Sequence, residues 1–143
     1  MARIRDLLNS RETYYVQADI SAQQAAQYMT DKNVGAVPVV SGTELVGVLS
    51  ERDLVRRILM QGLDWTTTKV SEVMTSDPLT VKPSDDLQDC MVLMKRHGFR
   101  HLPVFENEHL EGFVSMRDLL LHDLDEKEIE MRMMRSYIAS GGE

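Results

Sequence analysis

Residues 37–54 read VPVVSGTELVGVLSERDL, and residues 102–119 read LPVFENEHLEGFVSMRDL. The two stretches align without a gap at an offset of 65 residues, which places Asp53 on Asp118. The same offset continues upstream through the preceding strand and helix positions, whereas chance identities would scatter over many registers. The chain therefore holds two copies of one structural unit.

Both copies predict the same order of elements, namely a short strand, a helix, a hairpin of two strands and a second helix. In the first copy, apolar residues spaced three and four apart follow Ser21, a residue type that caps helices. Two β-branched runs flank the turn residues 41–43, and the second helix begins at Ser50. The other expected elements are first strands at Val16 and Val81, strands at 36–40, 45–49, 102–105 and 110–114, a helix from Asp85–Asp86 to Gly98, and a helix beginning at Ser115.

These elements divide the chain into four parts: repeat 1 (1–64), a linker (65–69), repeat 2 (70–124), and a C-terminal amphipathic helix and tail (125–143). The C-terminal helix is expected to carry its apolar residues on one face. A core of two repeats offers that face no obvious partner, so we expect a homodimer in which this helix packs across the interface. The residues of the expected face are Ile129, Met133, Met134, Tyr137 and Ile138.

Composition limits the classes of partner. The chain has 143 residues with 23 acidic and 16 basic side chains, a formal net charge of −7. This length suffices for a buried core without structural metal, and the single cysteine cannot form an internal disulfide. An acidic balance argues against nucleic acid or a membrane surface as the main partner, since both bind basic faces. No apolar run indicates a signal peptide or membrane span, so we expect a cytoplasmic location.

The duplicated unit, its h-x-P-h strand and its G-h-h-S-x-x-D junction (h, apolar) resemble a cystathionine-β-synthase (CBS) domain pair, also called a Bateman module. The resemblance covers about residues 4–124. It implies an α/β (α+β) fold of two tandem β-α-β-β-α repeats packed about a pseudo-twofold axis. It also implies a regulatory protein that dimerises through helices and binds adenine nucleotides in the clefts between its repeats.

The Ser-x-x-Asp junctions, Ser50 to Asp53 and Ser115 to Asp118, have two interpretations. A serine at the N-cap with an acid three residues later is a capping box, which occurs in proteins of any function. The same helix start offers unpaired N–H groups to a phosphate. The resemblance assigns both aspartates to ribose and both serines to ribose or phosphate. A glycine three residues before each serine would leave room for a ligand, and the two interpretations are compatible.

The two clefts are expected to differ in charge. Arg100 and His101 precede the second hairpin, where family members carry phosphate-holding basic pairs, whereas the matching Gly35 and Ala36 are uncharged. The cleft at Asp118 therefore has its own cations. The cleft at Asp53 must borrow cations, for which the candidates are Arg52, Arg117 and Lys82. Family analogy also implies Gln17 and Ala18 beside Asp118, Val81 and Lys82 beside Asp53, and Val37 and Leu102 as apolar walls for adenine.

Few cations per cleft favour AMP, ADP or NAD(H) over ATP as the ligand, with S-adenosylmethionine as an alternative. We expect a module that binds such a nucleotide and signals to an effector protein in trans by a population shift. A ligand-free interaction or dimerisation module, in which the Ser-x-x-Asp pairs are only caps, is the alternative. An enzyme acting on a bound nucleotide is disfavoured, because the sequence lacks a Walker loop, a nucleophile elbow and a metal-type histidine pair. No catalytic or metal-binding residue is assigned.

Overall fold

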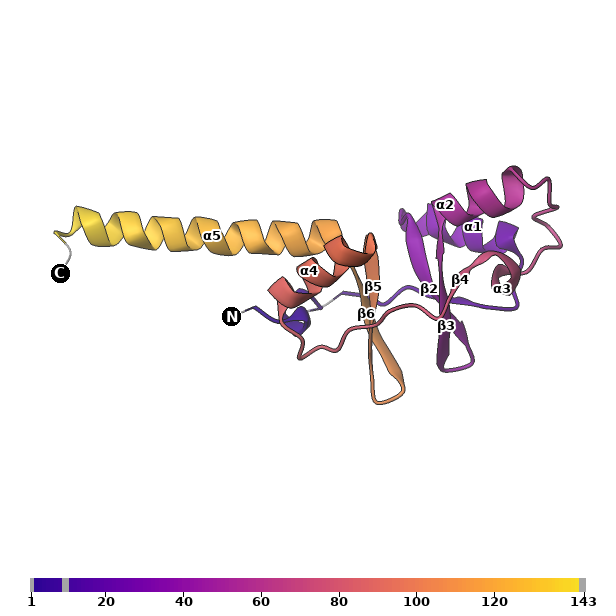
Figure 1. Cartoon of the computed structure of the whole chain (residues 1–143), viewed down its shortest axis with the longest axis horizontal. Coiled ribbons are helices and arrows are strands. Elements are labelled where there is room, and N and C mark those ends of the chain that lie inside the picture. Colours follow the sequence, from indigo (N-terminus) through magenta and orange to yellow (C-terminus); the bar gives the residue numbers. More distant parts are fainter. Residues whose placement is uncertain (1, 9–10, 142–143) are drawn as a thin grey trace.

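Each copy of the repeat folds into a hairpin flanked by helices (Figure 1). The computed structural model describes residues 2–8 and 11–141. Two α+β units lie next to each other, and a long helix projects from the second. In chain order the elements are η1 (Ile4–Leu7), β1 (Val16–Gln17), α1 (Ala22–Lys32), β2 (Ala36–Ser41), β3 (Glu44–Ser50), α2 (Glu51–Leu54), η2 (Val55–Leu59), α3 (Val70–Val73), β4 (Thr75–Ser76), α4 (Leu87–His97), β5 (His101–Glu106), β6 (His109–Ser115) and α5 (Met116–Ala139).

The strand pairings of the two units correspond. The first unit holds a sheet of order β1-β2-β3-β4, and the second holds the β5-β6 hairpin. β1 runs parallel to β2 through the pair Val16–Val39, and an isolated parallel bridge joins Val81 to Val104 at the equivalent place. The register of each hairpin also shifts at equivalent positions, directly after Val39 and directly after Val104. The predicted repeat is confirmed, and the structure adds an irregularity that both copies share.

Local sequence determines where the two long helices of the repeats begin and end. Ser21 accepts a hydrogen bond from the Gln24 N–H at 3.1 Å, and the Gln24 side chain accepts one from the Ser21 N–H at 3.0 Å, so α1 begins with a capping box. Asp86 caps α4 in the same way as Ser21 caps α1, through the N–H three residues later. α4 ends at Gly98, whose φ of 71° favours glycine. The buried residues of α1 and α4 occupy equivalent positions: Ala22, Ala25 and Met29, and Leu87, Cys90 and Met94.

Two short helices exchange places between the repeats. η1, at the start of the chain, packs in the core of the second unit, where Ile4 is fully buried and its N–H donates to the Asp85 carbonyl at 3.0 Å. α3, which precedes the second repeat in sequence, packs in the core of the first unit, and the Val70 N–H donates to the Ile20 carbonyl at 2.9 Å. Such a reciprocal exchange is the arrangement expected for two repeats related by a pseudo-twofold axis.

The packed units therefore do not follow the boundaries expected from the sequence. The segment 65–69 is also held in place rather than loose. The Ala22 N–H donates to the Thr68 carbonyl at 2.8 Å, and the Gln23 N–H donates to the Trp65 carbonyl at 3.0 Å. The linker is thus attached to the start of α1 and belongs to the first unit.

The C-terminal helix expected from residue 125 is not a separate element. α5 runs unbroken from Met116 to Ala139, because no glycine or proline interrupts this stretch. Leu119 and Asp123 are its buried residues, and its distal half extends away from the second unit (Figure 1). Within the described ranges, no helix has the length and apolar character needed to cross a membrane.

Candidate functional site

A cleft of about 550 Å³ lies between the two repeats at the N-terminus of α5. The first repeat contributes the turn after α1 and the segment 11–14, and the second contributes the start of β5, part of β6 and the first turn of α5. The Thr13 hydroxyl donates to the Glu111 carbonyl at 3.3 Å, which ties the segment 11–14 to β6. Volumes of about 300–1,000 Å³ are typical of small-molecule sites. The cleft is therefore large enough for a mononucleotide.

Asp118 lies in this cleft at the start of α5. Its Oδ2 accepts from the Ser115 N–H at 2.9 Å, and its own N–H donates to the Ser115 hydroxyl at 3.1 Å, so the capping box is present. The Arg11 guanidinium also reaches Oδ2, with Nη2 at 3.3 Å. Among the described residues, these contacts with the carboxylate all use Oδ2. The Asp118 side chain is 28% exposed and keeps its other oxygen for a further donor.

Arg100 and His101 line the same cleft, as expected. The Arg100 carbonyl accepts from the Met116 N–H at 2.8 Å, which joins the start of β5 to the start of α5. The His101 ring stacks on Phe113, with centroids 5.2 Å apart. Burial lowers the pKa of His101, and this lowering exceeds the opposing effect of the Asp118 carboxylate. The imidazole is therefore mainly neutral at pH 7.

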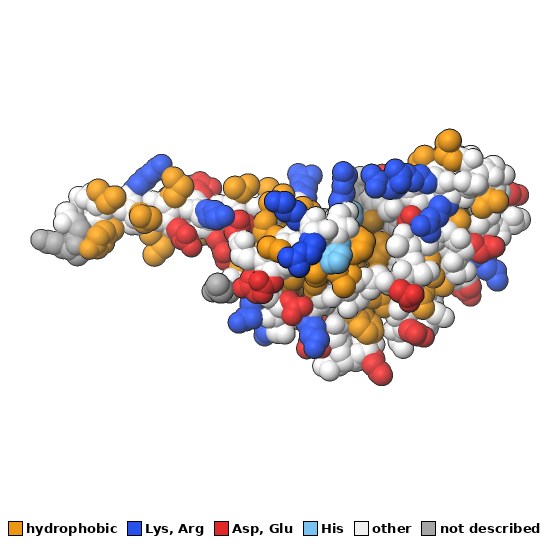
Figure 2. All heavy atoms as spheres, viewed as in Figure 1, with side chains coloured by type: hydrophobic (Ala, Val, Ile, Leu, Met, Phe, Trp, Pro, Cys, Tyr) orange, Lys and Arg blue, Asp and Glu red, His pale blue; other side chains and the backbone are white. Residues whose placement is uncertain are grey.

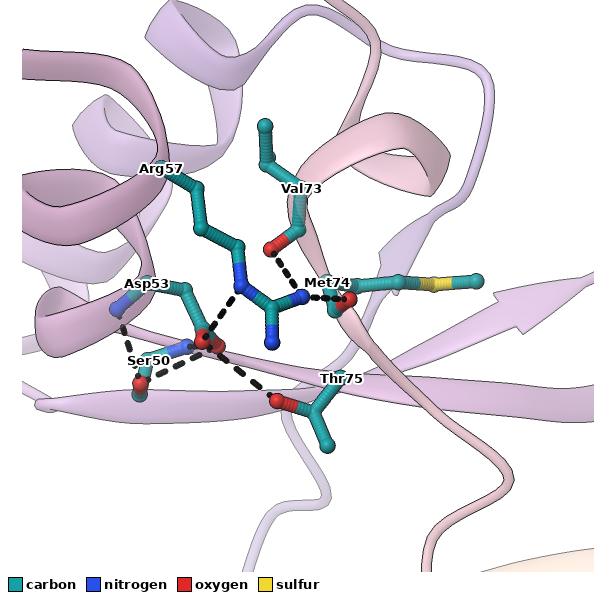
Figure 3. Close-up of polar contacts among 6 residues, drawn as sticks. All are labelled: Ser50, Asp53, Arg57, Val73, Met74 and Thr75. Atoms are coloured by element: carbon teal, nitrogen blue, oxygen red, sulfur yellow. Dashed lines mark hydrogen bonds and ion pairs between the residues drawn. The ribbon is translucent and has the colours of Figure 1, made fainter. Parts of the chain in front are cut away.

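The equivalent site at Asp53 is occupied by the chain's own side chains (Figure 3). Asp53 is only 8% exposed. Its Oδ2 accepts from the Ser50 N–H at 3.0 Å and the Ser50 hydroxyl at 3.1 Å, while its Oδ1 accepts from the Thr75 hydroxyl at 3.3 Å. Arg57 Nε lies 3.8 Å from the same Oδ1. Both carboxylate oxygens are thus engaged inside the protein.

Arg57 also fixes the crossover to the second repeat. Its Nη1 donates to the Met74 carbonyl at 2.6 Å and to the Val73 carbonyl at 3.3 Å, so the guanidinium bridges η2 and the segment leading into β4 (Figure 3). The position equivalent to Arg57 in the second repeat is His122, whose shorter side chain lies 3.9 Å from Glu126. Asp53 therefore has an arginine four residues later in the chain, whereas the equivalent position after Asp118 carries a histidine.

The cation beside Asp53 is Arg57, and none of the expected candidates takes this place. Arg52 is exposed on α2, and Arg117 lines the cleft at Asp118. Lys82 lies in a turn of the second unit, where its N–H donates to Asp85 Oδ2 at 2.8 Å. The sequence did offer a signal for Arg57, because residues four apart on a helix are neighbours.

Three of the expected pocket-wall residues lie within the cores of their own units. Val37 is fully buried in the first core, and Leu102 (1% exposed) and Val81 (3%) are buried in the second. Gln17 accepts from the Gly42 N–H at 3.2 Å, and the Ala18 N–H donates to a β2 carbonyl at 2.9 Å. Gln17 and Ala18, which were expected beside Asp118, do not line the cleft there, and neither do the expected adenine walls Val37 and Leu102. The segment that reaches Asp118 precedes β1 and carries Arg11, which was not predicted because it lies outside any recognisable element.

The glycines before each Ser-x-x-Asp junction serve close packing of the chain. A Cβ on Gly47 would lie 2.5 Å from the Met74 sulfur and 2.8 Å from the Thr75 carbonyl oxygen. A Cβ on Gly112 would lie 2.6 Å from a Leu8 methyl group. Met74 and Leu8 directly follow the exchanged helices α3 and η1. The expectation that Gly47 clears space for a ligand is therefore wrong, since that space is filled by protein.

Cys90, which is buried in the core of the second unit, does not line the cleft. Burial raises the pKa of the Cys90 thiol to about 11, so it is protonated and unreactive at pH 7. Over residues 2–8 and 11–141, no group of three or more His, Cys, Asp or Glu side chains is placed to hold a metal ion. The cleft combines carboxylates, arginines and a helix N-terminus, which together suit a polar organic ligand that carries a phosphate.

Comparison with known proteins gives matches to one protein family over both repeats. The model of the CBS domain matches residues 4–60 and again residues 70–125. The chain is 35% identical over 124 residues to the CBS domain-containing protein YhcV of Bacillus subtilis, covering 87% of each chain.

Solved structures agree with the sequence relatives. The chain superposes on a CBS-domain containing protein from Agrobacterium tumefaciens with a TM-score of 0.78 and 30% identity, covering 85% of this chain and 99% of the other. It also superposes on the CBS domain pair of protein MJ0100 in complex with 5′-methylthioadenosine and S-adenosyl-L-methionine, with a TM-score of 0.78, covering 88% and 98% of the two chains. At 20% identity, the second likeness shows the fold alone.

Proposed function

Because the chain belongs to the CBS domain family and is a tandem pair of such domains, we propose that it is a regulatory module whose cleft at Asp118 binds one adenine nucleotide. CBS pairs are regulatory and generally non-catalytic. The observation that carries the proposal is the asymmetry between the two sites. The cleft at Asp118 is open and lined by both repeats, whereas Arg57 and Thr75 occupy the equivalent site at Asp53.

The contacts of the cleft support a specific orientation of the ligand. Asp118 accepts the ribose hydroxyls, as its position in the family motif implies, and Arg11 moves from Oδ2 toward the phosphate. The first turn of the 24-residue α5 provides N–H groups and a positive dipole end beside the phosphate. Arg100 and His101 flank the same side. Charge-assisted hydrogen bonds of this kind are worth about 1.5–3 kcal/mol each.

The charges in the cleft favour ligands with few phosphates. Three arginines line it, but so do the carboxylates of Glu12, Glu111 and Asp118, so the formal charges cancel. ATP would bring more negative charge than this balance accommodates, and AMP, ADP or NAD(H) are therefore preferred. S-adenosylmethionine is the second candidate, because Glu12 and Glu111 suit its positive charge.

Regulation would follow from the position of the cleft between the repeats. A ligand that contacts both repeats favours the inter-repeat angle at which both sets of contacts form, which shifts the population toward that state. We propose that an effector protein in the cytoplasm recognises the shifted state in trans.

Ligand binding is tested by titrating the wild type and Asp118→Asn with AMP, ADP, ATP, NAD, NADH and S-adenosylmethionine. Asp118 is the third residue of α5, and an asparagine there keeps a side-chain carbonyl that can accept from the Ser115 N–H, so the variant should keep its fold and lose the charge. We expect one adenine ligand to raise the melting temperature of the wild type by about 5–10 °C near 100-fold saturation. The Asp118→Asn variant should bind that ligand about tenfold more weakly by calorimetry.

Asp53→Asn is the matched control, because it makes the same substitution at the closed site. Its dissociation constant should stay within about twofold of the wild type. Equal losses in both variants would contradict the single-site proposal. Absence of a shift with every ligand, in protein that melts cooperatively, would favour a ligand-free interaction module.

The pH dependence of binding tests the role of His101. Its pKa is lowered by burial in the free protein, and a phosphate beside the ring would favour the imidazolium and raise that pKa in the complex. Binding then takes up a proton, so affinity increases as pH falls from 7.5 to 6, by about threefold to tenfold. Calorimetry of the wild type against His101→Gln isolates this effect, because the titration of the ligand itself is common to both. Parallel pH profiles would exclude a phosphate contact at His101.

A further inference from the structure

The distal half of α5 carries exposed apolar side chains that the two repeats do not cover. Met131 is 53% exposed, Met134 is 64% and Ile138 is 70%. Hydrophobic side chains recur along this projecting helix in Figure 2, away from the body of the molecule. Nearer the body, Leu120 and Leu124 are also exposed, at 44% and 61%. Large exposed apolar surfaces of this kind mark interaction sites.

The exposed apolar residues of α5 do not form the single face that was expected from the sequence. A residue advances by about 100° around an α-helix, so Ile129 and Ile138, nine residues apart, lie on opposite sides of α5. Ile129, Met133 and Tyr137 follow each other at intervals of four and form a short second side. The expectation of one apolar face is therefore wrong. A longer stripe of exposed residues lies on the Ile138 side of α5, opposite Ile129.

The longer stripe, hereafter the α5 seam, runs the length of the helix. Its members succeed each other at intervals of four, three, four, three and four residues. The mean of these five intervals is 3.6 residues, and the alternation of fours and threes is that of the two apolar positions in a coiled-coil heptad. The members of the α5 seam are Leu120, Leu124, Lys127, Met131, Met134 and Ile138. The spacing fits another helix better than a flat surface.

Charge along α5 changes sign from one half to the other. The segment 123–130 holds five acidic residues and one lysine, whereas the segment 131–139 holds two arginines and no acid. A parallel pair of such helices would place the two acidic segments side by side. In an antiparallel pair, the basic segment of each copy can face acidic residues of the other, and the helix dipoles are opposed.

We propose that α5 pairs antiparallel with α5 of a second copy of this chain, so that each distal half lies along the body of the other copy. The register that matches the two seams sets Leu120 against Ile138 and Leu124 against Met134 of the second copy. Lys127 then stands opposite Met131. This single polar position in the α5 seam specifies the register, as polar seam residues do in coiled coils.

The association is tested with two double variants, each of which replaces two exposed apolar residues of α5 by aspartate. Leu124→Asp with Met134→Asp charges the α5 seam, and Ile129→Asp with Met133→Asp charges the opposite side. All four side chains are at least half exposed, so neither variant disturbs a core. We expect native mass measurement to give twice the 16.3 kDa chain mass for the wild type and the second variant, and 16.3 kDa for the seam variant. A monomeric wild type, or a seam variant that stays dimeric, overturns the proposal.

The orientation is tested by disulfide formation in a Cys90→Ala background. An antiparallel pair holds residue 120 of one copy close to residue 138 of the other, but separates the two copies of residue 138 by about 27 Å along the axis. A disulfide needs Cα atoms within about 7 Å. Mixing Leu120→Cys with Ile138→Cys protein should therefore give the cross-linked heterodimer. Rapid cross-linking of Ile138→Cys alone would show a parallel pair and overturn the proposal.

Discussion

Replacement of Leu102 by alanine is expected to lower the free energy of unfolding by about 2–5 kcal/mol and to change nucleotide affinity by less than about threefold. Leu102 is 1% exposed and packs in the core of the second unit with Leu87 and Met94. Removing three carbons leaves a cavity there, because the close-packed neighbours relax only in part. Urea denaturation followed by circular dichroism measures the loss of stability.

A matched control separates the core role of Leu102 from the adenine wall that family analogy implied. Leu110→Ala makes the same substitution in the same hairpin at a half-buried position, and should lose less than half as much stability. If Leu102→Ala unfolds at the wild-type urea concentration but binds nucleotide at least tenfold more weakly, the side chain contacts the ligand and our placement of it in the core is incorrect.

Features encoded by neighbouring residues could be predicted from the sequence. The hairpins, the capping boxes at Ser21, Ser50 and Ser115, and the end of α4 at Gly98 depend on side chains within a few positions of each other. The internal duplication gave a second, independent copy of most of these signals. Prediction of both repeats therefore did not depend on any contact between distant segments.

The parts that could not be predicted are contacts between segments far apart in the chain. The exchange of η1 and α3 places Ile4 beside residues some 80 positions later, and nothing in the local pattern indicates it. Arg11 reaches Asp118 from a segment without regular structure. The same limit explains why Gly47 was expected to leave room for a ligand. Met74 fills that space only because α3 packs in the first unit.

The long-range contacts around Asp53 predict a second large effect of a substitution on stability. Asp53→Ala is expected to lower the free energy of unfolding by about 2–4 kcal/mol. The substitution removes the carboxylate half of the capping box of α2, whose N-cap is Ser50, and leaves the Ser50 N–H without its acceptor. It also leaves the Thr75 hydroxyl and the Arg57 guanidinium without their carboxylate partner. Because the Arg57 side chain is 48% exposed, water compensates part of the second loss, and the total stays below that of a fully buried pair.

A double-mutant cycle between Asp53→Ala and Arg57→Ala assigns this loss to the pair. The two side chains interact directly, so urea denaturation of the four proteins should give a coupling of about 0.5–1.5 kcal/mol. Arg57→Ala alone also frees the carbonyls of Val73 and Met74, which loosens the start of β4 and opens the closed site. If the closed site is structural, none of the three variants loses nucleotide binding at Asp118. If instead Asp53→Ala keeps the wild-type stability and loses a bound nucleotide, Asp53 is a ribose acceptor and the asymmetry between the sites, on which the proposed function depends, does not exist in solution.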